Sequence, residues 1–160
     1  LHPVAHSFPT RRSSDLFLLL DGVTDVRNFG SILRTAESSG VSAVIVPQQG
    51  TARINEDMVK TSAGAIFNIP ICKVNHLKDA LYFLKAHEVT LIGASEKSNQ
   101  SLFDSTIEKP VALVLGSEGL GIHHSIIKML DHTYHIPMKG QTQSLNVSVA
   151  AGLFLYELMR

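Results

Sequence analysis

Residues 111–121 read VALVLGSEGLG, an uncharged run that leads into a glycine-rich segment. The apolar run has the length of a β-strand, and its continuous hydrophobicity is typical of a strand covered on both faces. A strand of this kind belongs to a parallel sheet packed between layers of helices. The glycines that follow predict a tight turn in which backbone groups can approach a ligand closely.

Similar apolar runs alternate with helical patterns along the chain. We predict strands at residues 17–20, 43–46, 69–74, 89–94, 111–116 and 134–138. We predict helices at residues 29–39, 55–66, 77–87, 123–131 and 145–159. This alternation predicts an α/β fold, with a mostly parallel sheet and helices on both of its faces.

The composition is that of one globular domain. The chain has 160 residues, of which 44% are hydrophobic and 18% charged, and its formal net charge is zero. A neutral chain does not by itself point to nucleic acid, although a local patch or a further domain can supply positive charge. The single Cys72 excludes an internal disulfide and fits a reducing compartment, so we expect a cytoplasmic protein. No apolar run is long enough for a membrane helix, and we expect no membrane partner.

Residues 1–16 differ from the rest of the chain. LHPVAHSFPTRRSSDL mixes His, Pro, Ser and Arg without periodicity. It resembles translated sequencing-adapter sequence, and an ordinary flexible tail is the alternative. We therefore expect residues 1–16 to be a non-native or disordered tail, and residues 17–160 to form the domain.

The predicted last helix is apolar on nearly every side, from Val147 to Met159. A helix of this kind is buried. One subunit of this size can hardly bury it completely, so we expect a second copy of the chain to cover it in a symmetric dimer.

The first of three polar segments, residues 21–40, follows a predicted strand. Ligands of open α/β sheets bind beyond the carboxyl ends of the strands. Asn28 could bind a ligand there, or it could simply cap the helix that begins near it. Arg34 could hold a phosphate group, or it could pair with Glu37 on the helix surface.

The second polar segment is the turn that carries Glu118. Its glycine spacing, G-x-x-G-x-G, differs from the G-x-G-x-x-G of dinucleotide-binding folds, and no Gly-Lys-Ser/Thr follows as in a P-loop. Glu118 could therefore belong to a different ligand site, or it could be a solvated residue on a plain turn.

The third polar segment, residues 139–146, precedes the last helix. Ser144 could cap that helix, although Val147 takes the place of the Glu or Gln of a capping box. A role as nucleophile is disfavoured, because no G-x-S-x-G motif surrounds Ser144. Since all three segments follow predicted strands, we expect them to form one composite site. The histidines lack the spacing of metal ligands, and we expect no metal.

Three sequence stretches carry a family resemblance. NFGSILRTAESSG (28–40), LVLGSEGLGI (113–122) and IPMKGQTQSLNVSVAAGLFLYE (136–157) resemble the signature motifs of the SpoU (TrmH) family of RNA ribose methyltransferases, within the SPOUT superfamily. Their order and spacing also match, and the resemblance covers residues 17–160. It implies a SPOUT fold, in which the C-terminal part forms a deep trefoil knot, an exception to the rule against knotted chains.

The resemblance also implies a reaction, methyl transfer from S-adenosylmethionine to a ribose 2′-hydroxyl of RNA, and a homodimer that forms through the C-terminal helix. The positions that match the family's cofactor-binding residues are Leu115, Gly116, Ile136, Met138, Ser144, Leu145 and Asn146. The positions that match its catalytic residues are Asn28, Arg34, Glu118, Ser144 and Asn146. A guanidinium is a poor base, so we expect Arg34 to hold the target phosphate and stabilise developing alkoxide charge.

Two stretches indicate one branch of the family. LLLDGVTDVRNFGSILRTAE (18–37) and KTSAGAIFNIPICKV (60–74) are similar to the subgroup that methylates a guanosine of 23S ribosomal RNA. Members of that subgroup usually carry an N-terminal RNA-binding domain, which this chain lacks, so we expect cofactor binding but weak RNA binding. The alternatives are a transfer RNA ribose methyltransferase, a non-catalytic RNA-binding relative and, from a different class, a nucleotide-dependent oxidoreductase.

Overall fold

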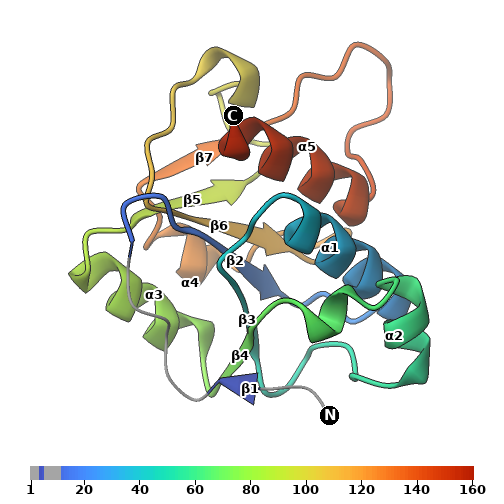
Figure 1. Cartoon of the computed structure of the whole chain (residues 1–160). Coiled ribbons are helices and arrows are strands. Elements are labelled where there is room, and N and C mark those ends of the chain that lie inside the picture. Colours follow the sequence, from blue (N-terminus) through green and yellow to red (C-terminus); the bar gives the residue numbers. More distant parts are fainter. Residues whose placement is uncertain (1–3, 6–11) are drawn as a thin grey trace.

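The structure is a computed structural model that describes residues 4–5 and 12–160. Its α-helices and strands, together with two short 3-10 helices (η), alternate along the chain (Figure 1). In chain order they are β1 (Val4–Ala5), β2 (Leu16–Asp21), α1 (Val26–Ser38), β3 (Ala43–Pro47), α2 (Glu56–Thr61), η1 (Ala65–Phe67), β4 (Ile71–Val74), α3 (Leu77–Ala86), β5 (Thr90–Ala94), η2 (Leu102–Asp104), β6 (Val111–Gly116), α4 (His124–Ile127), β7 (His132–Tyr134) and α5 (Val147–Met159).

The strands form one seven-stranded sheet in the order β1-β4-β3-β2-β6-β5-β7. Every pairing between named strands of the described part is parallel. The strands β2 and β6 lie next to each other in the middle of the sheet, with Asp21 in register with Gly116, although 94 residues lie between these two residues in sequence. The chain builds the sheet outward from β2 in one direction and returns to its other side, so a topological switch point lies between β2 and β6.

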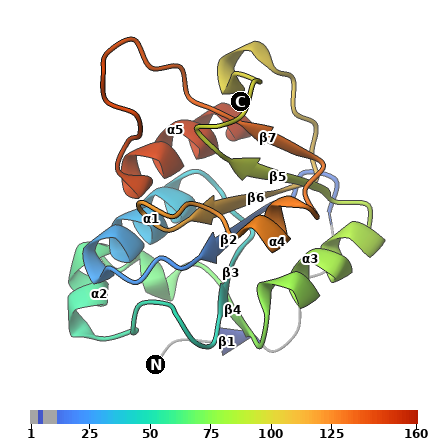
Figure 2. The same ribbon diagram turned by 180° about the vertical axis from the view of Figure 1, so that it is seen from behind.

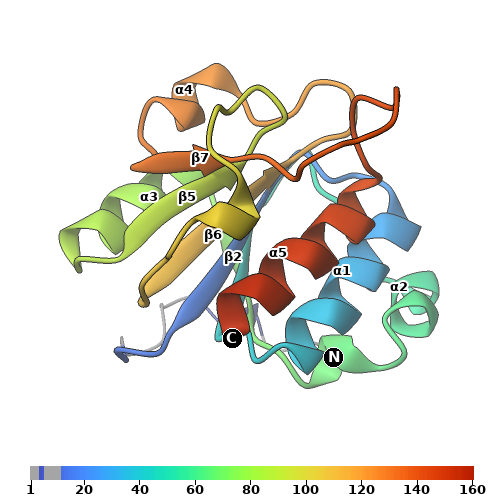
Figure 3. The ribbon, with the colours of Figure 1, turned by 90° about the horizontal axis from the view of Figure 1, so that it is seen from above.

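Helices cover both faces of the sheet. Figure 3 shows α1, α2 and α5 on one side, and α3 and α4 on the other. Successive residues of β2 supply the two resulting cores: Leu18 and Leu20 face the first layer of helices, whereas Phe17 and Leu19 face the second. This explains why the strands are apolar without alternation, and it confirms the predicted α/β class. The trefoil knot stays a prediction.

The predicted helix at residues 55–66 is wrong in its extent. The α-helix α2 ends at Thr61, and the chain then turns through Ala63 and Gly64, which have φ values of 52° and 80°. These left-handed conformations stop the helix, and residues 65–67 continue as the 3-10 helix η1. The apolar spacing alone gave no sign of this break.

The predicted strand at residues 134–138 is also displaced. The strand β7 comprises His132–Tyr134 and pairs with β5. Residues 135–138 continue without regular structure apart from a bridge between Ser101 and His135. Pro137 has no N–H to offer a neighbouring strand, which suits the irregular conformation that follows β7.

Two helix predictions need smaller corrections. The helix α4 is shorter than the predicted 123–131. The last helix begins at Val147 instead of residue 145. The segment that connects β7 to this helix is a long loop, drawn in orange and red in Figure 2.

The expected tail, residues 1–16, is described only in part, because residues 1–3 and 6–11 lie outside the described residues. Val4 and Ala5 pair in parallel with Ile71 and Cys72 at the edge of the sheet. Leu16 already belongs to β2. The domain therefore includes at least one residue before the predicted boundary, while the origin of the tail stays a prediction.

The helix α5 packs against α1 and the sheet with only part of its surface. Phe154 and Leu155 are buried in the core of this face. Val149, Leu153 and Tyr156 are 51%, 38% and 48% exposed. Their spacing of three and four residues places them along one side of the helix. An apolar stripe therefore remains uncovered by the described residues of one chain.

Candidate functional site

The three polar segments meet at the carboxyl edge of the sheet. The strands β2 and β6 end side by side at Asp21 and Gly116. The segment after β2 leads into α1, and the segment after β6 forms the glycine-rich turn. The backbone N–H of His123, beyond that turn, donates to the Asp21 carboxylate at 2.8 Å. This contact joins the first and second segments at the switch point of the sheet.

The helix α1 begins earlier than the sequence predicted. Asp25 is its N-cap, and the Asp25 side chain accepts a hydrogen bond from the backbone N–H of Asn28 at 2.9 Å. The interpretation of Asn28 as the cap is therefore wrong. Because Asp25 satisfies the helix terminus, the Asn28 side chain is available for other partners.

The turn after β6 needs its glycines for two different reasons. Gly121 has a φ of 69°, and its backbone N–H donates to the Ser117 carbonyl at 2.9 Å, which folds the turn back on itself. A Cβ atom at Gly116 would collide with the backbone of Gly121 and with the backbone nitrogen of Ile122. The close return of the chain to Gly116 thus excludes any side chain there and presents Glu118 at the edge of the sheet.

Asn28, Glu118 and Asn146 form a hydrogen-bonded cluster. The Nδ2 of Asn28 donates to Oε1 of Glu118 at 3.1 Å. The Nδ2 of Asn146 donates to the same oxygen at 2.8 Å and to Oδ1 of Asn28 at 3.1 Å. One side chain from each motif therefore takes part. The cluster connects the starts of α1 and α5 to the turn after β6, as the prediction of a composite site required.

Asn146 also begins the last helix. Its Oδ1 accepts from the backbone N–H of Ser148 at 2.9 Å and from the Ser148 hydroxyl. Asn146 is the N-cap of α5, so the interpretation of Ser144 as the cap is wrong. The polar segment before the apolar helix α5 thus supplies, in Asn146, both the helix cap and a member of the cluster.

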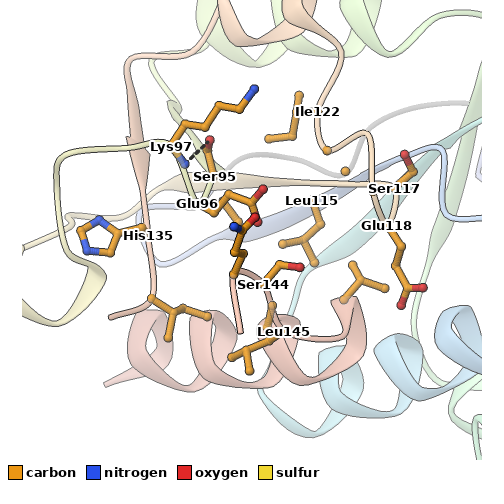
Figure 4. A pocket seen from close by; sticks show the side chains of 18 of the residues that line it. Ser95, Glu96, Lys97, Leu115, Ser117, Glu118, Ile122, His135, Ser144 and Leu145 are labelled. Carbon is orange, nitrogen blue, oxygen red and sulfur yellow. Dashed lines mark hydrogen bonds between the residues drawn. The ribbon is translucent and has the colours of Figure 1, made fainter. Parts of the chain in front are cut away.

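A pocket of about 730 Å³ lies beside this cluster (Figure 4). Its lining includes Glu118 and every residue predicted to bind cofactor. These residues are Leu115, Gly116, Ile136, Met138, Ser144, Leu145 and Asn146. We call residues 115–122 and 136–147 the motif wall, since the lining residues in these ranges come from the second and third motifs. Their roles stay predictions.

Two predicted site residues are not among those that line the pocket. Asn28 reaches it indirectly, through its hydrogen bonds to Glu118 and Asn146. Arg34 is an exposed residue of α1. No ion pair between described residues joins Arg34 to Glu37, so the structure does not form the surface pair considered for this spacing. The Arg34 guanidinium remains available to a ligand that approaches from outside.

Sequence reasoning missed one side of the pocket. Ser95, Glu96 and Lys97 follow β5, and His135 follows β7. We call these four residues the edge wall. Nδ1 of His135 is buried without a hydrogen-bond partner in the part of the chain that the structure describes. The available signal for Ser95, Glu96 and Lys97 was their position after the predicted strand at residues 89–94, the rule that had identified the motif segments, whereas His135 fell inside the predicted strand at residues 134–138.

Burial also affects one ionisable group of the lining. Tyr134 is only 6% exposed, and desolvation raises the pKa of its phenol above the ordinary value. Tyr134 is therefore neutral near pH 7. Within residues 4–5 and 12–160, no group of three or more His, Cys, Asp and Glu side chains could hold a metal ion. No helix in this described part is both long and apolar enough to cross a membrane.

The chain belongs to the SpoU rRNA Methylase family, whose model matches residues 15–156. This confirms the predicted family. A relative from Yersinia pestis named 23S rRNA (guanosine-2′-O-)-methyltransferase RlmB is 42% identical over 143 residues, which are 89% of this chain and 58% of the relative. The relative of the same name from Escherichia coli K12 is 38% identical, with 89% and 59% covered. The chain thus spans about three-fifths of the length of these relatives.

Solved structures agree with this assignment. The SpoU methyltransferase AviRb from Streptomyces viridochromogenes, solved in complex with the cofactor AdoMet, has a TM-score of 0.86 and 29% identity. The match covers 94% of this chain and 58% of that one. The TrmH/SpoU tRNA modifying enzyme from A. aeolicus has a TM-score of 0.83 and 30% identity, with 92% and 75% covered.

Proposed function

We propose that the pocket binds S-adenosylmethionine. Its volume lies within the range of small-molecule sites. Leu115, Ile136 and Leu145 offer apolar surface for an adenine ring, and the polar residues of both walls offer partners for the rest of the ligand. The AdoMet complex of AviRb supports the same ligand for this chain.

We propose that the chain catalyses methyl transfer to a ribose 2′-hydroxyl of RNA. The bound cofactor would supply an electrophilic methyl group on its sulfonium. Protein side chains have to align the hydroxyl oxygen with that methyl group, and alignment alone can contribute several kcal/mol. The observation that carries this proposal is the cluster of Asn28, Glu118 and Asn146 beside the pocket, which Glu118 and Asn146 help to line.

Each residue of the site then has a role that its chemistry allows. The Glu118 carboxylate holds both amide groups in fixed orientations, so that Asn28 and Asn146 can position the substrate. Ser144, which lines the pocket, offers a hydroxyl that can donate or accept. Arg34 holds the RNA phosphate beside the target and stabilises charge that develops on the ribose oxygen.

The RNA substrate that we propose is 23S rRNA, at a guanosine. The names of the relatives from Yersinia pestis and Escherichia coli support it. Transfer RNA is the second candidate, since the A. aeolicus neighbour is a tRNA modifying enzyme. An rRNA substrate implies a cytoplasmic location.

We also propose a homodimer and a knot. The exposed stripe of Val149, Leu153 and Tyr156 on α5 supports the dimer, because a second copy would remove this apolar surface from water. Membership of the family supports the trefoil knot. In sedimentation equilibrium, Leu153→Arg should convert the dimer to a monomer. A wild-type monomer at micromolar concentration would contradict the dimer.

The function is tested by methyl transfer from S-[methyl-³H]adenosylmethionine to unmodified 23S rRNA and to unmodified tRNA. We expect label in 23S rRNA, released on digestion as 2′-O-methylguanosine. Label in tRNA alone would indicate that the substrate is tRNA and not 23S rRNA. Folded protein that labels neither RNA would contradict the proposed activity.

A further inference from the structure

The edge wall carries a carboxylate that no motif includes. Ser95, Glu96 and Lys97 leave the carboxyl end of β5 and line the pocket. Their backbone is fixed to the neighbouring strand, because the Ser95 N–H donates to the Tyr134 carbonyl at 2.9 Å. The Ser98 hydroxyl adds a bond of 2.6 Å to the Thr133 carbonyl. This segment is thus a rigid part of the site, held by both of its ends.

The Glu96 side chain has no ion pair or hydrogen bond with another described residue. Figure 4 shows it directed into the pocket, on the side opposite Glu118, with Leu115 and Ser144 drawn between the two carboxylates and Leu145 below them. Since the ionised carboxylate is an acceptor only, it needs a ligand that presents hydrogen-bond donors. Glu96 is exposed in the empty pocket, so it costs little to keep it charged there.

The proposed function determines which donors can reach this carboxylate. The reacting methyl group has to lie at the Glu118 side, where the cluster meets incoming RNA. The nucleoside half of the cofactor then extends across the apolar middle of the pocket toward Glu96. The ribose of that nucleoside carries two neighbouring hydroxyl groups, which match the two oxygens of one carboxylate. An acidic residue after a strand holds the ribose of dinucleotides by the same chemistry.

We propose that Glu96 accepts hydrogen bonds from the 2′- and 3′-hydroxyl groups of the cofactor ribose. Glu96 is a positioning residue, since it fixes the nucleoside while the reacting atoms lie at the other end of the pocket. This inference rests on the proposed cofactor. It adds a specificity determinant that the three motifs do not contain.

Calorimetric titration separates this role from a general loss of structure. The ligands are S-adenosylhomocysteine, its 2′-deoxy analogue and 5′-methylthioadenosine, which retains the ribose but lacks the amino acid. The proteins are wild type, Glu96→Ala and Glu96→Gln. Glu108→Ala is the matched control, because Glu108 is an exposed residue before the amino end of β6, at the opposite edge of the sheet. Circular dichroism checks that each variant is folded.

Wild type and Glu108→Ala should bind S-adenosylhomocysteine about tenfold more tightly than the 2′-deoxy analogue, the factor typical of a hydrogen bond to a charged group. In Glu96→Ala this ratio should fall to about 1, and Glu96→Gln should lie between. For 5′-methylthioadenosine, Glu96→Ala should weaken binding by about the same factor as for S-adenosylhomocysteine.

Each contrary result has its own meaning. If folded Glu96→Ala kept the wild-type preference for S-adenosylhomocysteine over its 2′-deoxy analogue, the ribose contact would be overturned. A loss for S-adenosylhomocysteine with none for 5′-methylthioadenosine would place Glu96 at the amino acid half and would equally overturn it. Failure of folded wild type to bind any of these ligands would overturn the proposed cofactor, and this inference with it.

Discussion

The two walls of the pocket are built in different ways. The motif wall depends on backbone shape: Gly116 has no room for a side chain, and Gly121 has a left-handed backbone. The edge wall consists of ordinary polar residues, among them Glu96 and Lys97, on a loop fixed to β7. In the motif wall, the backbone shape restricts which amino acids can occupy Gly116 and Gly121. In the edge wall, the contacts to β7 fix the position of the loop but do not restrict its amino acids. The motif wall was predictable because its residues belong to the family motifs, whereas the residues of the edge wall belong to none.

The largest expected effect follows from filling the middle of the pocket. Leu145→Arg places a long charged side chain beside Leu115 and Ser144 (Figure 4). Binding of S-adenosylhomocysteine should weaken about 1000-fold, which corresponds to roughly 4 kcal/mol. The control is Phe67→Arg, since Phe67 is 55% exposed and does not line the pocket. Titrations in which both variants bind like wild type would show that the ligand lies elsewhere.

A second effect tests the shape of the motif wall. Gly116→Ala forces a Cβ atom against the backbone of Gly121, so the turn has to move. We expect the free energy of unfolding to fall by about 3 kcal/mol, the upper part of the range for overpacking. Gly140→Ala is the control, because nothing lies within 4 Å of a Cβ atom at Gly140. Urea denaturation measures both, and equal stability of the two variants would contradict the tight turn.

A third effect concerns Arg34, which lies on neither wall. Arg34→Ala should lower methyl transfer about 100-fold, the usual cost of a lost group that stabilises transition-state charge. The affinity for S-adenosylhomocysteine should stay within about twofold of wild type, because Arg34 does not line the pocket. Arg53→Ala, at another exposed arginine, should change neither quantity. If Arg34→Ala transferred tritium at the wild-type rate, Arg34 would have no role in the mechanism.

The smallest effect distinguishes the role of Asn146 as the N-cap of α5 from its role in the site. Asn146→Ala and Asn55→Ala each remove an N-cap, from α5 and α2 respectively. Both should reduce the free energy of unfolding by about 1 kcal/mol. Only Asn146→Ala should also weaken cofactor binding, by about tenfold, because Asn146 lines the pocket and bonds to Glu118. Equal affinities in the two variants would reduce Asn146 to a helix cap.

The layers of this fold were predictable because they follow from the pattern of hydrophobic residues along the chain. Continuous apolar strands such as β2 require helices on both faces, and the two cores fulfil that requirement. The extent of several elements was less predictable. Left-handed residues Ala63 and Gly64 end α2 where the apolar pattern continues, and Pro137 follows a strand that has already ended. Such local interruptions do not alter the hydrophobic pattern from which the elements were predicted.

The site also contains residues that the sequence predicted and residues that it did not. The motifs identified Asn28, Glu118 and Asn146, and strand ends predicted that they would meet. The helix caps are Asp25 and Asn146, so the capping alternatives considered for Asn28 and Ser144 are wrong. The edge wall follows β5 in a polar connection like many others, and only the neighbouring position of β7 brings it to the pocket. Pairing between distant strands is a tertiary property that no local pattern contains.

We propose that the pocket is a preformed site for S-adenosylmethionine. The most direct measurement is calorimetric titration of the wild-type chain with S-adenosylmethionine, using NAD as the control nucleotide. We expect saturable binding of S-adenosylmethionine with one site per chain, and no heat of binding with NAD. A folded chain that binds NAD, or that does not bind S-adenosylmethionine at millimolar concentration, would contradict it.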